Sequence, residues 1–361
     1  MYTKRIRPGL TEANRMKQIA FSEHVHKRWG LPDNKKILWT MSDEKWWFGL
    51  VARTFAKMCP ALGIAKEVFS VHHKKHISKV MAHATVGYFF NGNPENGGEG
   101  LLIHIQRCQA FKVAQRGYRG KGGRAVKKGD CLLTDCNVTG TDIGTPDKPK
   151  FALKGLWEYA LLPSLDALVA VGGQCEGAIV IHQEDNAGMC FTQTFAIALN
   201  INLSMTLLQY LCQYLVGPHK EGGFHTWLTT QFTQRGWQLE LQAPQGPYTN
   251  VLDLQVFPSM SKRHSELLQI YNNTETDTDR IWAVALSIWK GITSAMIARA
   301  FLLAYRIMGK IIETKGDTNW LKDGAPHCNV RRDYHDTDRG VMKTTDVVDI
   351  VDENTAPSQS Y

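Results

Sequence analysis

The chain has 361 residues, of which 43% are hydrophobic and 10% aromatic, so it can bury the core of one large domain or two modest ones. Its 42 Lys and Arg residues exceed its 34 Asp and Glu residues, and the net charge of +8 favours a polyanionic partner, nucleic acid before membrane. Eight Cys without CxxC spacing and an N-terminus without an apolar core argue against a secreted disulfide scaffold and predict reduced thiols in an intracellular protein.

The first predicted elements are one helix and three strands. A basic helix is predicted over residues 11–29, as a lead-in arm. Strand-like runs follow at 35–41, 79–90 and 100–111, and the turn-forming stretch NGNPENGGEG separates the last two. Three strands in succession predict an antiparallel start to a sheet.

Two basic stretches are candidates for contact with DNA. Residues 112–128 hold seven basic residues, four glycines and no acid, which fits either a solvated insertion or a phosphate-contacting loop. The stretch HHKKH at 72–76 favours a basic DNA-facing surface over a zinc site, because no Cys or carboxylate accompanies its histidines. The predicted DNA-binding residues in these stretches are Lys74, Lys75, Arg116, Arg119, Lys121 and Arg124.

The second half of the chain mixes helices and strands. The predicted order is a helix at 156–171, a strand at 178–183, helical material at 204–215, a strand at 237–244 and a helix at 251–268. The apolar period of 281–313 then predicts one long helix, capped by Thr278 or Asp279. Arg299 and Arg306 lie inside its most apolar part, which argues against a membrane span.

Three Asp residues occupy comparable places in this pattern. Asp43 follows the first strand, Asp185 follows the fourth, and Asp253 stands in the helix after the fifth. The order of elements suits an α/β fold of the ribonuclease H-like type, with a mixed five-stranded sheet flanked by helices. Acids so placed can converge at one sheet edge, where their hard oxygens suit two-metal phosphodiester cleavage. Each Asp alone also fits an ordinary strand or helix terminus, so the residues leave both interpretations open.

The segments that carry these acids resemble a known family. MSDEKWWF, HQEDNAGMC and QAPQGPYTNVLDLQVF resemble, in that order, the three signature blocks of mariner-family DDE/D transposases. RPGLTEANRMKQIAF resembles the family's link into the catalytic domain, HKKHISKVMAHATVGYF its second strand with the preceding loop, and ALLPSLDAL the helix before the second Asp. The resemblance covers most of residues 7–313.

The resemblance implies a catalytic site and a cofactor. Asp43, Asp185 and Asp253 become the catalytic and metal-binding triad for Mg²⁺ or Mn²⁺, with their carboxylates expected within about 4–8 Å of one another. The metals would activate a water to cut DNA and then the freed 3′-hydroxyl for strand transfer. Lys45 and Asn186 also match motif positions and are expected to support the site or contact DNA.

Two further acids adjoin the triad without belonging to it. Glu44 and Glu184 are each next to a triad member in the sequence, so strand alternation predicts that they point to the opposite side of their strands.

The implied partners are transposon ends and target DNA, with no membrane. A homodimer is expected because two element ends must be brought together, and the nucleus is the expected location in a eukaryotic host. The expected domains are a basic helical arm at 1–34, a catalytic domain at 35–275 with insertions near 112–150 and 191–223, a long helix packing on the core at 276–316, and an irregular region with an acidic disordered tail at 317–361. An inactive DNA-binding relic and a stand-alone nuclease of the same fold remain alternatives.

Overall fold

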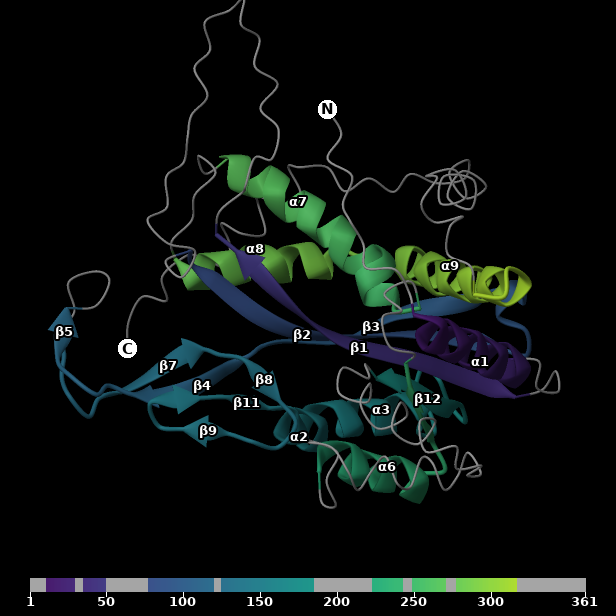
Figure 1. Ribbon diagram of the computed structural model, residues 1–361, viewed down its shortest axis with the longest axis horizontal. Helices are drawn as coiled ribbons and strands as arrows, with labels where there is room; N and C mark the ends of the chain where they lie inside the picture. Colours follow the sequence, from purple (N-terminus) through teal and green to yellow (C-terminus); the bar gives the residue numbers. More distant parts are fainter. Residues whose placement is uncertain are drawn as a thin grey trace, which may run out of the picture.

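A five-stranded mixed sheet forms the centre of the fold (Figure 1). The computed structural model describes residues 11–29, 35–49, 77–119, 125–184, 223–242, 249–270 and 277–316. The strands are β1 (Lys36–Phe48), β2 (Lys79–Asn91), β3 (Gly98–Arg107), β12 (Ile179–Glu184) and β13 (Gln238–Leu241). Their order is β13-β12-β1-β2-β3; β1, β2 and β3 are antiparallel, while β12 and β13 run parallel to β1. This topology is ribonuclease H-like, which confirms the predicted fold class and antiparallel start.

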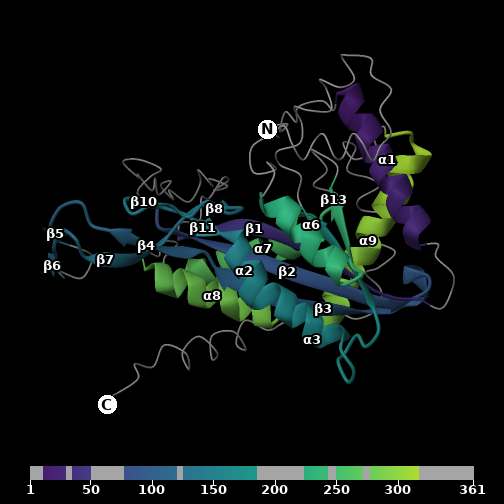
Figure 2. The same ribbon diagram turned by 90° about the horizontal axis from the view of Figure 1, so that it is seen from below.

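Helices cover both faces of the sheet (Figures 1 and 2). One face is covered by α7 (Phe257–Ile270), α8 (Thr278–Lys290) and α9 (Ser294–Glu313). The other is covered by α2 (Leu153–Leu156), the π-helical turn η5 (Trp157–Leu161), α3 (Leu162–Val169) and α6 (Phe224–Gln234). Side chains alternate along β1, so Trp39 and Met41 enter the first core and Leu38 the second. The face of any β1 residue therefore follows from its position.

The first strand is longer than predicted. Each residue of β1 pairs with β2, as far as Phe48 opposite Lys79. Its pairing with β12 stops at Met41 opposite Gln183. Asp43 therefore lies within β1, just past the end of the parallel pairing, and not after the strand as predicted. The β2 ladder keeps the backbone extended through the charged residues.

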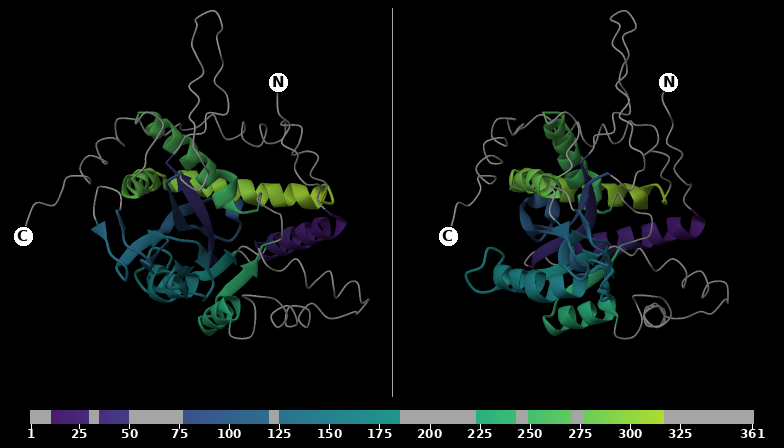
Figure 3. Two further views of the ribbon diagram at one scale, coloured as in Figure 1. Left: turned by 60° about the vertical axis from the view of Figure 1, so that its left-hand side comes forward. Right: turned by 90° about the vertical axis from the view of Figure 1, so that its left-hand side faces the viewer.

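Helix α1 (Glu12–Trp29) agrees with the helix predicted at 11–29 and lies alongside α9 (Figure 3). The His26 ring stacks on the Tyr305 ring with centroids 4.0 Å apart, and His26 Nε2 lies 3.0 Å from the Tyr305 carbonyl oxygen. His24 Nε2 lies 3.0 Å from Glu240 Oε2, which connects α1 to β13. The helix is thus part of the packed domain.

The prediction of one long helix over 281–313 is wrong. Helix α8 ends at Gly291, and α9 begins after Thr293, whose side chain caps it. The two helices are bent by 82° at this break. The apolar period runs on through the break, so periodicity alone did not reveal it. No single helix in the described ranges is long and apolar enough to cross a membrane, although α8 and α9 together satisfy length and composition.

An arm of short ribbons projects from the sheet over residues 109–152 (Figure 2). Its strands are β4 (Gln109–Val113), β5 (Tyr118–Arg119), β6 (Ala125–Val126), β7 (Cys131–Asp135), β8 (Val138–Thr139), β9 (Gly144–Thr145), β10 (Lys148–Pro149) and β11 (Phe151–Ala152). The pairs are β4 with β7, β5 with β6, β9 with β10 and β8 with β11. The strand predicted at 100–111 is therefore two strands, because the chain changes partner from β2 to β7 after Arg107.

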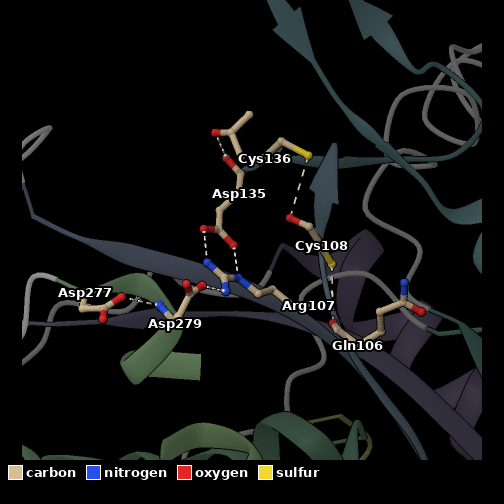
Figure 4. A network of polar contacts seen from close by, with 8 residues as sticks. Gln106, Arg107, Cys108, Asp135, Cys136, Asp277 and Asp279 are labelled. Carbon is tan, nitrogen blue, oxygen red and sulfur yellow. Dashed lines mark hydrogen bonds and ion pairs between the residues drawn. The ribbon is translucent and has the colours of Figure 1, made fainter. Parts of the chain in front are cut away.

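Arg107, at the end of β3, joins the arm to the core (Figure 4). Its Nε and Nη2 donate to the two carboxylate oxygens of Asp135 at 2.6 and 2.8 Å, and its Nη1 donates to Asp279 Oδ1 at 2.6 Å. Asp277, which precedes the two predicted capping residues, caps α8 by accepting from the Asp279 backbone N–H at 2.9 Å. The Asp135 side chain is 12% exposed and that of Asp279 is 84% exposed.

The two ion pairs of Arg107 should differ in strength. Asp135→Ala leaves a nearly buried guanidinium without its bidentate partner, so we expect the free energy of unfolding to fall by about 3 kcal/mol. Asp279→Ala removes a solvent-screened partner and should cost less than about 1 kcal/mol. Urea denaturation of both variants beside the wild type measures these losses. Equal losses would contradict the importance of burial in this network.

Candidate active site

Two of the three predicted acids lie on the same face of the sheet. Asp43 shares the face of β1 that carries Trp39 and Met41 toward α7, α8 and α9. Asp253 lies in the π-helical turn η7 (Leu252–Val256), which leads directly into α7. Asn250 connects the two elements, because its Nδ2 donates to Asp43 Oδ2 at 3.1 Å across 207 residues of sequence.

Asn250 also caps the helical segment that carries Asp253. Its backbone carbonyl accepts from the Leu254 N–H at 2.8 Å, and its side-chain Oδ1 accepts from the Leu252 N–H at 3.0 Å. The other oxygen of Asp43, Oδ1, accepts from the Glu44 backbone N–H at 2.7 Å. Both oxygens of Asp43 thus accept from protein donors, which fix the orientation of the carboxylate.

The end of β12 holds the turn that precedes Asn250. Gln183 is 2% exposed, and its Nε2 donates to the Thr249 carbonyl at 2.8 Å and to Gln242 Oε1 at 3.3 Å. The Gln242 backbone N–H donates to the Glu184 carbonyl at 2.9 Å. The turn is therefore fixed against the ends of both β12 and β13. The chain then continues from Glu184 into Asp185, which lies outside the described residues.

The side chain of Glu184 points to the reverse face of the sheet, as predicted. Its Oε2 lies 2.7 Å from His182 Nε2, and His182 Nδ1 lies 2.8 Å from Thr40 Oγ1. Because an ionised carboxylate only accepts, Nε2 carries the proton and the Thr40 hydroxyl donates to Nδ1. Burial lowers the pKa of His182 to about 3, so this ring is neutral. Strand alternation places Glu44 on the same reverse face.

Lys45 lies on the acid-bearing face, two residues after Asp43. Its ammonium is 5.3 Å from the Phe257 ring centroid and 5.6 Å from that of Trp47, within cation–π range. Burial lowers the pKa of Lys45, whereas the negative charges of Asp253 and Asp43 act in the opposite direction. Lys45 therefore interacts with both acids and offsets part of their mutual repulsion.

Two of the predicted DNA-binding arginines lie apart from this cluster. Arg116 and Arg119 are exposed, and β5, which carries Arg119, lies at the far end of the arm (Figure 1). The remaining site predictions fall outside the described residues; these are Asp185, Lys74, Lys75, Lys121, Arg124 and Asn186. The separation of the three carboxylates consequently stays a prediction.

The donors present suit a hard divalent cation. Asp43 and Asp253 offer carboxylate oxygens, and the Asp43 carboxylate is oriented by amide and backbone donors. Such donors fit Mg²⁺ or Mn²⁺ better than zinc. No group of three or more His, Cys, Asp or Glu side chains within the described ranges could hold a metal ion. The metal-binding role of these acids therefore stays a prediction.

Sequence reasoning missed Asn250 and Gln183. Asn250 had a usable signal, because an Asn directly before an apolar run such as VLDLQVF is a typical helix N-cap. Gln183 had none, since its role depends on the backbone of residues 66 positions away.

No protein-family model matches the sequence. No curated protein matches it either. Among solved structures, the chain is similar to Mos1 transposase in a paired-end complex with the left transposon end (12% identity, TM-score 0.46, covering 88% of this chain and 66% of that chain). It is also similar to the Mos1 mariner paired-end complex with Mn (12% identity, TM-score 0.47, 88% and 67%) and to the Mos1 transposase catalytic domain with Raltegravir and Mg (10% identity, TM-score 0.39, 86% and 98%). The chain thus spans about two thirds of the paired-end-complex chains. These neighbours belong to the family that the three sequence blocks resemble.

Three buried histidines give the fold a defined pH dependence. Burial lowers the pKa of His83 and of His182 to about 3, and that of His264 to about 4. The unfolded chain binds protons at these side chains below about pH 6.5, whereas the folded protein does so only at lower pH. Their combined effect is that stability falls as the pH falls from about 6.5 toward 4.

His83 provides the test of this dependence, because neither of its ring nitrogens has a hydrogen-bond partner in the structure and the side chain is 0% exposed. We expect His83→Leu to reduce the loss of unfolding free energy between pH 7 and pH 5 by about 2 kcal/mol. Urea denaturation at the two pH values measures the difference. An unchanged pH dependence would show that the pKa of His83 is the same in the folded and unfolded chain, so that burial does not lower it.

Proposed function

We propose that this chain is the catalytic domain of a mariner-type DNA transposase, which cuts phosphodiester bonds at element ends and transfers the freed 3′ ends to target DNA. The observation that carries the proposal is that one residue, Asn250, links the segments that carry Asp43 and Asp253. They come from separate sequence blocks that resemble the family, and Asn250 links their segments on one face of a ribonuclease H-like sheet.

The strand register supports Asp185 as the third acid. Parallel pairing of β1 with β12 ends at Met41 opposite Gln183. Side chains alternate along a strand, and Gln183 contacts the turn that leads to η7. The residue two positions after Gln183 is Asp185, and the residue two positions after Met41 is Asp43. The pairing of β1 with β12 stops before these acids, but strand alternation would give both of them the same face of the sheet.

Asp43, Asp185 and Asp253 would hold two Mg²⁺ or Mn²⁺ ions, which when bound supply activation of the attacking water or 3′-hydroxyl and charge stabilisation. The protein's own contribution is to orient the Asp43 carboxylate through Asn250 and the Glu44 backbone. Lys45 offsets the charge of the acids, which would otherwise repel one another.

The arm is the proposed DNA-binding surface. Lys112, Arg116, Arg119, Lys127 and Lys128 are exposed on it, which suits contact with phosphates. We also propose that two copies act together, one at each element end, and that the protein works in the nucleus of a eukaryotic host. In this proposal residues 35–275 form the catalytic domain.

Catalysis is tested by metal-dependent nicking of a labelled DNA duplex. We expect Asp43→Asn and Asp253→Asn each to lower the rate by about 1000-fold or more, because each loses a charged metal ligand. Glu44→Gln is the matched control: it removes the same charge one residue away on the reverse face, and it should retain cutting. Equal losses in all three variants would contradict the assignment of Asp43.

The same assay distinguishes the alternatives. Nicking without strand transfer would favour a stand-alone nuclease, and salt-sensitive DNA binding without nicking would favour an inactive relic.

DNA binding by the arm is tested with Arg116→Ala combined with Arg119→Ala. Because each phosphate contact releases about 0.9 counterion, losing two contacts should reduce the slope of log affinity against log salt by about 2. Fluorescence anisotropy over a range of salt concentrations measures the slope. An unchanged slope would place the phosphate contacts elsewhere on the protein.

A further inference from the structure

We propose that Asn250 is a positioning residue for the metal site. It binds the Asp43 carboxylate and the first turn of the Asp253 segment at the same time, so it sets the orientation of one acid relative to the other. This inference rests on the proposed function, and it adds a residue whose role neither the sequence blocks nor the triad assigns.

The argument begins with the reach of the side chain. An amide carries both a donor and an acceptor, and Asn250 uses each on a different element: Nδ2 donates to Asp43 Oδ2, and Oδ1 accepts from the Leu252 N–H. An Asp at this position would lack the donor. A Ser would keep a capping oxygen but is too short to span both contacts.

The surroundings hold Asn250 in place. The side chain is only 4% exposed, and Thr249 before it is fully buried. Gln183 fixes the Thr249 carbonyl from the β12 side, while the Val251 N–H lies 3.4 Å from Met41 Sδ on the β1 side. The turn therefore holds the Nδ2 donor in a fixed position beside Asp43. Hydrogen bonds to a charged acceptor in such a partly desolvated place are stronger than those between neutral groups.

The consequence for metal binding follows from the orientation of the Asp43 carboxylate. Each oxygen accepts a hydrogen bond from the protein, and the two bonds together set the plane of the carboxylate and the directions from which a cation can bind. Without the Asn250 donor the carboxylate can rotate about its χ2 bond, and part of the binding free energy of the cation must then restrict it. Loss of such an outer contact typically weakens metal binding about 10–100-fold.

The test is Mn²⁺ binding by the full chain, measured by isothermal titration calorimetry without DNA. Asn250→Ser should keep the helix cap and lose only the contact to Asp43, so we expect Mn²⁺ affinity to fall about 10-fold with little change in the metal-free melting temperature. Asn250→Thr, also a capping residue too short to reach Asp43, serves if the Ser variant does not fold. The expected fold-change is the same.

Thr293→Ala is the control for an effect of capping alone. Thr293 Oγ1 accepts from the Met296 N–H at 3.3 Å at the start of α9, so its loss should lower the melting temperature without changing Mn²⁺ affinity.

The outcomes separate this proposal from the proposed function. If the wild type binds Mn²⁺ and Asp253→Asn abolishes binding, the site exists; affinity in Asn250→Ser within twofold of the wild type then overturns the positioning role alone. A parallel loss of affinity in Thr293→Ala would also overturn it, because general destabilisation would be the cause. If the wild type binds no Mn²⁺ at millimolar concentrations, the metal site itself fails and the positioning role fails with it.

Discussion

The unequal pairing of β1 on its two sides determines how the rest of this structure is arranged. Over its first half β1 lies between β12 and β2, and its side chains enter two apolar cores. Beyond Met41 only β2 continues, so the strand stays rigid while one side becomes open to other segments. The turn at 249–250 packs over the acid-bearing face at this point, where Asn250 binds the Asp43 side chain and the helix that carries Asp253 begins. A rigid but half-paired strand is a suitable support for charged groups that need fixed geometry.

The same strand explains which parts of the fold were predictable. Alternating apolar residues and turn chemistry indicated the five strands and the antiparallel start of the sheet, because those signals are local. The extent of β1 was missed, since DEK interrupts the apolar run and only the β2 ladder, a nonlocal contact, keeps these residues extended. The break at Gly291 was missed for the opposite reason, because the apolar period persists across it. The acids could be proposed from their blocks, but the Asn250 contact to Asp43 spans 207 residues and had no signature of its own.

Near Asp43 and Glu184, polar side chains on the two faces of the sheet are stabilised in different ways. On the acid-bearing face, Asn250 donates a hydrogen bond to Asp43, and the positive charge of Lys45 offsets the negative charges of Asp43 and Asp253. On the reverse face, Thr40, His182 and Glu184 form a chain of hydrogen bonds, and burial keeps the histidine neutral. The hydrogen bond to His182 therefore fixes the side chain of Glu184, the residue before Asp185. Buried polar chains of this kind rigidify a strand end when every member is satisfied, as His182 is.

The π-helical turn at Leu252–Val256 has a consequence for how this region tolerates insertions and deletions. A π-turn is equivalent to one extra residue in an α-helix, and each α-helical residue advances the side chains by about 100°. Removing a single residue from this turn would restore a regular α-helix, because the wider turn already takes up that residue, so the segments on either side would keep their phase. Removing a residue from the regular part of α7 would instead rotate everything before it by about 100° relative to the rest of that helix. Asp253 and the capped start of the helix would then leave the phase in which they meet β1. Chain length is therefore more constrained in α7 than in the π-turn.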